Sequence, residues 1–93
     1  MRHNPPVYNE SLMKARVYVS LKDTVLDPQG KTVCSALQGL GYQDIADVRQ
    51  GKYFEITLKE GVEPEAVRRE IEEAAHEVLA NPVIEEYRVE FLD

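Results

Sequence analysis

The sequence predicts a small α+β domain in which an antiparallel sheet carries two helices on one face. Segments 14–22 and 83–92 alternate apolar and polar side chains with the period of a strand. Two further segments begin at a proline and place apolar side chains at helical spacing. Two helices suffice to cover one apolar sheet face, so the opposite face is expected to stay open.

The first predicted strand covers residues 14–22, and its side chains divide cleanly between two faces. The apolar face carries Ala15, Val17, Val19 and Leu21, and the polar face carries Arg16, Tyr18, Ser20 and Lys22. This period of two is typical of a strand that is buried on one side only.

The first predicted helix covers residues 28–40. Asp27 is an expected N-cap, because the residue before a proline avoids helical geometry, and Pro28 suits the first helical position. Gly41 supplies the stop. The apolar stripe consists of Val33, Leu37 and Leu40. Because Gly30 lies in the first turn and weakens a short helix, we expect this helix to need packing partners.

Residues 43–59 form the most extended part of the chain, and two conformations compete for them. Gln50-Gly51 suits a tight two-residue turn between two strands, because glycine tolerates positive φ. Alternatively, the chain runs nearly straight through Gly51, and the part before it pairs with a second subunit. With the hairpin counted as two strands, the element order is β-α-β-β-α-β, a relative of the ferredoxin-like arrangement.

The second predicted helix begins near Pro64 and ends before Asn81-Pro82. Its apolar stripe consists of Val67, Ile71, Ala74, Ala75 and Val78. The last strand follows at about 83–92. The open sheet face is expected to present Tyr18, Tyr53 and Arg88, and exposed tyrosines of this kind suit contact with another subunit.

Composition excludes several classes of function. The 93 residues carry a net charge of -6, which disfavours binding to nucleic acid or to anionic lipid. No apolar run approaches the roughly 18 residues needed to span a bilayer. The lack of a secretory segment predicts a cytoplasmic protein, and the single cysteine, Cys34, agrees with a reducing compartment.

No motif in the sequence supports an active site. Gly30-Lys31-Thr32 resembles the end of a phosphate loop, but the glycine required five residues earlier is replaced by Val25. Cys34 has no evident base and is expected to act as a small hydrophobe, whereas His76 is expected at a boundary or exposed helix position. The glutamates of the second helix spread around it and do not converge on a metal. We therefore predict no catalytic, cofactor-binding or metal-binding residue.

A charged group, Arg49, Lys52 and Glu55, interrupts the extended segment around Gly51. Arg49 is suited to bind a carboxylate, on a partner or within the subunit, through two parallel hydrogen bonds. The alternative is that these charges are exposed and discourage edge-to-edge aggregation.

Four motifs follow one another along the chain: Val17-Tyr18-Val19-Ser20-Leu21-Lys22, Val25-Leu26-Asp27-Pro28-Gln29-Gly30, Asp47-Val48-Arg49-Gln50-Gly51-Lys52-Tyr53-Phe54-Glu55 and Leu79-Ala80-Asn81-Pro82-Val83-Ile84-Glu85-Glu86-Tyr87. These motifs resemble those of the PurS family, the small subunit of phosphoribosylformylglycinamidine synthase. The resemblance covers about 13–93, and residues 1–12 form an extension that we expect to be flexible; translation could begin at Met1 or Met13.

The resemblance implies a function by assembly in de novo purine biosynthesis. A glutaminase subunit releases ammonia from glutamine, and a synthetase subunit uses ATP and Mg to make the formylglycinamidine. The small subunit joins the two and supports ammonia transfer without a cofactor or active site of its own. A stand-alone regulatory module that binds a small metabolite is the alternative, and it requires a pocket with converging polar groups.

The resemblance also implies an intertwined homodimer or a tetramer, in which the first helix and the second strand are exchanged between subunits. Such an exchange favours the straight path through Gly51 and would bury surface that so short a chain leaves uncovered. The interface candidates are Tyr18, Asp27, Pro28, Gly30, Arg49, Gly51, Lys52, Tyr53, Glu55, Asn81 and Pro82.

Overall fold

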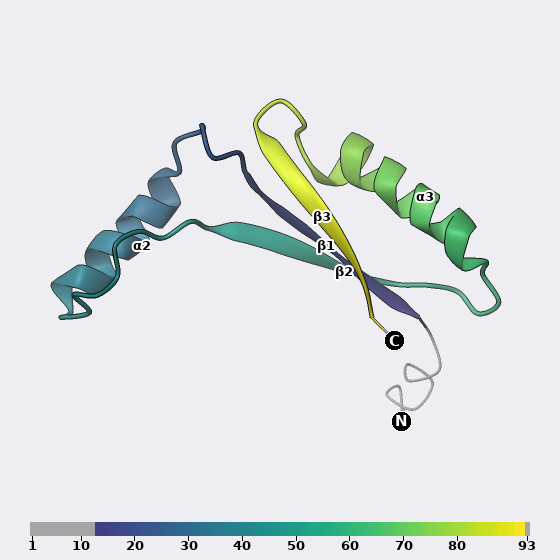
Figure 1. The fold of residues 1–93 in the computed structure, drawn as a ribbon, viewed down its shortest axis with the longest axis horizontal. Helices are drawn as coiled ribbons and strands as arrows, with labels where there is room; N and C mark the ends of the chain where they lie inside the picture. The colour runs from purple at the N-terminus through teal and green to yellow at the C-terminus, as the bar shows by residue number, and fades with distance from the viewer. Residues whose placement is uncertain (1–12, 93) are drawn as a thin grey trace, which may run out of the picture.

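The computed structural model describes residues 13–92 and contains one antiparallel sheet with strand order β2-β1-β3 (Figure 1). The extension predicted at 1–12 lies outside the described residues. The elements in chain order are β1 (Lys14–Leu21), α2 (Pro28–Gly39), β2 (Gly51–Thr57), α3 (Pro64–Ala74), the π-helical segment η1 (Ala75–Leu79) and β3 (Glu85–Leu92).

The register of the sheet separates an apolar face from a polar one. Val17 lies opposite Phe54 on β2 and opposite Val89 on β3, which places these three side chains on one face. On the other face, Tyr18 pairs with Tyr53 and with Arg88. The predicted alternation of β1 and of the last strand is therefore confirmed, and so are the three residues expected on the open face.

One helical layer, α3 with η1, covers the apolar face and completes the core (Figure 1). Val17 and Ala15 on β1 are fully buried, and Val67 and Ile71 on α3 pack into the same cluster. Burying a valine or isoleucine side chain contributes roughly 1.5–3 kcal/mol, so this small cluster holds the sheet and α3 together.

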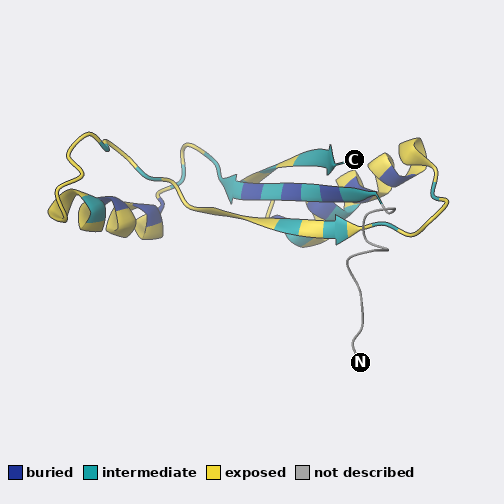
Figure 2. Cartoon of the chain, turned by 90° about the horizontal axis from the view of Figure 1, so that it is seen from below, coloured by how far each residue is buried: buried dark blue, intermediate teal, exposed yellow. Residues whose placement is uncertain are grey.

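The α+β class, the antiparallel sheet and the two helices are confirmed, but α2 does not share a face of the sheet with α3. It projects beyond one end of the sheet, and its surface is mostly exposed (Figures 1 and 2). Of the predicted apolar stripe, Val33 is 39% and Leu40 is 76% exposed. The placement follows from how the helix is attached, because its first turn is tied to the start of β2 at the sheet's end.

Of the two conformations considered for Gln50-Gly51, the structure has the straight path and not the hairpin, so the fourth strand is absent from residues 13–92. Gly51 is the first residue of β2 and pairs with Ser20, so the chain runs straight through it. Between α2 and Gly51 the chain runs back along the helix, and we call this part the returning segment. A side chain of the helix holds it, because Gln38 Nε2 donates to the Ile45 carbonyl at 2.8 Å. Ile45 and Val48 are three residues apart, a spacing that does not fit a strand. We call residues 28–50 the arm.

Candidate functional site

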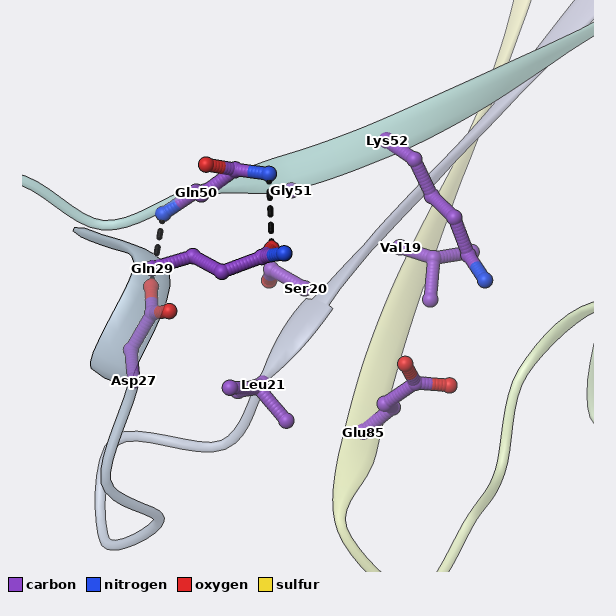
Figure 3. Close-up of a pocket in the computed structure, with 9 residues that line it drawn as sticks. All are labelled: Val19, Ser20, Leu21, Asp27, Gln29, Gln50, Gly51, Lys52 and Glu85. Carbon is purple, nitrogen blue, oxygen red and sulfur yellow. Dashed lines mark hydrogen bonds between the residues drawn. The ribbon is translucent and has the colours of Figure 1, made fainter. Parts of the chain in front are cut away.

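The base of the arm is organised by the buried carboxylate of Asp27, which is 4% exposed. Its Oδ1 accepts a hydrogen bond from the Gly30 amide at 3.0 Å, which confirms the predicted N-cap of α2. Its Oδ2 accepts from the Gln50 amide at 2.7 Å, where the arm enters the sheet (Figure 3). These two bonds, with a smaller contribution from the charge of Arg49, hold the pKa of the Asp27 carboxyl below its usual value.

Gly30 permits the two halves of the arm to meet at this base. A Cβ atom there would clash with the carbonyl oxygen of Val48 and with the Asp27 carboxylate. The helix can therefore approach the returning segment only because residue 30 lacks a side chain. Pro28 begins the helix as expected. The sequence singled out both residues as motif members but gave no sign of this contact.

Within residues 13–92, Arg49 binds backbone carbonyl oxygens and not a carboxylate side chain of its own subunit, so the predicted contact with a carboxylate on a partner stays a prediction. Its Nη2 lies 3.4 Å from the Leu21 carbonyl oxygen, 2.9 Å from that of Lys22 and 3.2 Å from that of Val25. The first acceptor is the last residue of β1, and the other two belong to the loop that leads into α2. Arg49 therefore ties the end of the arm to its own loop, while a role in a subunit interface stays a prediction.

The charged group predicted around Gly51 does not form a cluster. Glu55 pairs with Lys14 at 3.2 Å and with Arg16 at 3.7 Å on the open face. Lys52 instead lies over the ring of Phe54, with its Nζ 5.7 Å from the centroid. Residues 52 and 55 are three apart in a strand, so they project to opposite faces, and the sequence spacing alone excluded the cluster.

The open face of the sheet carries a row of stacked cations and aromatic rings. The guanidinium of Arg88 lies 4.3 Å from the Tyr18 ring centroid, and Tyr18 in turn lies 5.8 Å from Tyr53. The Tyr18 hydroxyl donates to Glu90 Oε1 at 2.8 Å. Tyr53 is 56% exposed, so ring surface is accessible on this face, while its role in a subunit interface stays a prediction.

Asn81 and Pro82 lie in the turn between η1 and β3. The Asn81 side-chain oxygen accepts from the Val83 backbone amide at 3.1 Å, and the Asn81 backbone amide donates to Glu85 Oε1 at 2.7 Å. This turn ends the second helix where the sequence predicted. The contacts explain the motif by local turn geometry.

A π-helical turn changes the second helix in a way that the sequence did not predict. The Ala80 amide donates to the carbonyl of Ala75, five residues earlier, at 2.9 Å. The wider turn rotates Val78 outward, so that it is 77% exposed although it belongs to the predicted apolar stripe. Together with Val83, which is 78% exposed, it adds apolar surface outside the core.

A pocket of about 290 Å³ lies at the junction of the arm and the sheet (Figure 3). Its polar lining includes Asp27, Gln29, Gln50, Lys52 and Glu85. Two of these side chains are already paired, since Gln50 Nε2 donates to Gln29 Oε1 at 2.8 Å. Both Asp27 oxygens are likewise engaged, so few polar groups are left to converge on a ligand.

The residues weighed as candidates for chemistry lie apart from one another. Cys34 is buried in α2, as expected of a small hydrophobe, and His76 is exposed in η1. Within residues 13–92, no three His, Cys, Asp or Glu side chains are grouped as ligands for a metal ion. In the same range, no helix has the length and apolar character needed to cross a bilayer.

Comparison with known proteins gives a consistent result over this whole fold. The family model "PurS: Phosphoribosylformylglycinamidine (FGAM) synthase" matches residues 14–93. The phosphoribosylformylglycinamidine synthase subunit PurS of Bacillus subtilis is 46% identical over 79 residues, which are 85% of this chain and 92% of the relative. That of Methanocaldococcus jannaschii is 40% identical over 78 residues, 84% of this chain and 93% of the relative.

Solved structures agree. The structure of B. subtilis PurS superposes with a TM-score of 0.71 at 44% identity, covering 87% of this chain and 99% of that one. A chain in the structure of PurLQS from Thermotoga maritima gives a TM-score of 0.79 at 30% identity, covering 87% and 98%. Sequence and fold match over the same residues, and this chain therefore belongs to the PurS family of phosphoribosylformylglycinamidine (FGAM) synthase subunits.

Proposed function

We propose that this chain is the non-catalytic small subunit of an FGAM synthase complex in de novo purine biosynthesis, where it joins a glutaminase subunit to a synthetase subunit. The observation that carries the proposal is the match to PurS chains over almost their whole length, one of them within a PurLQS structure. In this assignment ATP and Mg are used by the synthetase, and the complex works in the cytoplasm.

The exposed apolar surface of the arm supports a role in assembly. Leu40 is 76% and Tyr42 is 58% exposed, because both belong to a segment that projects away from the sheet (Figure 1). Surface of this kind is stabilised when another chain covers it. We therefore include self-association in the proposal, as a homodimer with exchanged segments or as a tetramer.

The physical benefit of the bridge is proximity. Ammonia that is released next to its acceptor reacts before it is lost to solvent or protonated, so fixing the two active sites near each other raises the yield of transfer. The chain itself need only dock. The alternative, a regulator that binds a small metabolite, has less support. The polar groups Asp27, Gln29 and Gln50 of the junction pocket already bond one another.

The proposal is tested by reconstituting FGAM synthesis from the separate subunits, with and without this chain. We expect that omitting it lowers glutamine-dependent turnover much more than turnover supplied with free ammonia. Equal losses with both nitrogen sources would contradict bridging and indicate activation of the synthetase. A complex that never forms between this chain and either large subunit would contradict the proposal altogether.

A further inference from the structure

The arm joins the sheet through two chain segments, and both are fixed at one carboxylate. The incoming loop reaches α2 at Asp27, and the returning segment reaches β2 at Gln50. Asp27 bonds the Gly30 amide with one oxygen and the Gln50 amide with the other, so a single side chain links the two segments across 23 positions of the sequence.

Two neighbouring side chains, Arg49 and Gln50, also link the incoming loop and the helix start to the returning segment. Arg49 donates to carbonyl oxygens of the incoming loop, and Gln50 Nε2 bonds Gln29 Oε1 in the first turn of the helix. Outside this junction α2 stands clear of the sheet (Figures 1 and 2). A helix that is joined to a sheet only through two loop segments can change its angle to the sheet, unless hydrogen bonds hold those two segments together.

We propose that Asp27 is a positioning residue that fixes the direction in which the arm leaves the sheet, and thereby prepares the chain to associate with a second copy of itself. The inference rests on the proposed function, because it assigns the arm to self-association. A preset direction lowers the conformational entropy that is lost when the arm engages another subunit. The exposed Val33, Leu40 and Tyr42 are the arm side chains that would gain cover.

The substitution Asp27→Asn separates the helix cap from the link between segments. Asparagine is as good an N-cap as aspartate, so its oxygen can still accept from the Gly30 amide. Its amide group then faces the Gln50 amide, and two donors cannot bond each other. Asp27→Ser provides a second variant, because serine also caps helices but is too short to serve both amides. Asp23→Asn removes the same charge from an exposed position of the same loop and is the control.

The readouts are amide hydrogen exchange and residual dipolar couplings on the full-length chain, with sedimentation equilibrium for self-association. In Asp27→Asn and Asp27→Ser we expect the Gln50 amide to exchange roughly ten- to a hundredfold faster, while exchange at Gly30 stays as in the control. The couplings of α2 should shrink relative to those of the sheet, and self-association should weaken by about tenfold or more.

Unchanged exchange at Gln50 and unchanged α2 couplings would overturn the positioning role. A freed Gln50 amide with unaltered self-association would overturn the link to assembly. A wild-type chain that neither self-associates nor binds the large subunits would instead refute the proposed function, while exchange and couplings would still decide what Asp27 does. The two failures are therefore distinguishable.

Discussion

Gly30 of α2 lies directly against the carbonyl oxygen of Val48, so that the helix and the returning segment touch where a side chain would have to be. The contact is made across 18 positions of the sequence. The helix needs glycine at this position to make room for the contact, and not because glycine is conformationally flexible. The missing Cβ is the feature that the structure uses.

Substituting Gly30→Ala should therefore destabilise the protein although alanine favours helices. We expect a loss of about 1–3 kcal/mol in the free energy of unfolding, because the added methyl group forces backbone apart. Chemical denaturation measures it. Gly39→Ala in the same helix is the matched control: nothing lies within 4 Å of its Cβ position, so a gain of roughly 0.4–1 kcal/mol is expected. Equal effects at both positions would show that the contact with Val48 is unimportant.

The lowered pKa of Asp27 predicts a stability contribution that depends on pH in one direction. A carboxyl group whose folded pKa is depressed stabilises the fold above its unfolded pKa of about 3.9, and this contribution is lost as pH falls through the lower folded pKa. Arg49 is the charged neighbour that acts on it. Thermal unfolding measured from neutral pH to about pH 2.5 should therefore show the wild type converging on Asp27→Asn below about pH 4. A stability difference that stays constant across this range would rule out the carboxylate as its source.

The π-helical turn makes Val78 and Ile71 respond differently to substitution, although the sequence places both on one stripe. Ile71 is 4% exposed in the core, and Ile71→Ala should cost roughly 2–5 kcal/mol in unfolding free energy. Val78 is 77% exposed, and Val78→Ala should change it by no more than about 0.5 kcal/mol. Denaturation of the two variants under conditions that keep each protein in the same oligomeric state compares them directly. A large loss at Val78 would mean that this side chain is covered in solution.

The open face of the sheet should matter more for binding than for stability. Tyr53 is more than half exposed and stacks with Arg16, whose guanidinium lies 5.2 Å from its ring centroid. We expect Tyr53→Ser to weaken binding to the glutaminase or synthetase subunit by at least about tenfold, because exposed aromatic residues often dominate interface energetics. Titration calorimetry with each purified subunit measures this effect. Glu60→Ala, in an exposed loop beyond β2, is the control. Binding that is equal for both variants would remove this face from the interface.

Local chemistry made much of the fold predictable from the sequence. Alternation assigned β1 and the last strand and sorted Tyr18, Tyr53 and Arg88 onto the open face, because strand period decides which side a residue faces. Asp27 and Pro28 set the start of α2 correctly, since a cap depends on only a few neighbouring residues. The motifs around these positions also sufficed to identify the family.

Only the tertiary structure decided how these elements are placed. The stripe on α2 predicted a packing face, yet the helix stands away from the sheet, because its base is bonded to Gln50 and a helical period does not say what will cover it. Arg49 donates to three carbonyl oxygens at the end of β1 and in the following loop, and Val78 is turned outward by a π-helical hydrogen bond. These outcomes depend on contacts between residues distant in the sequence, or on one extra residue in a turn, and neither leaves a periodic signal in the chain.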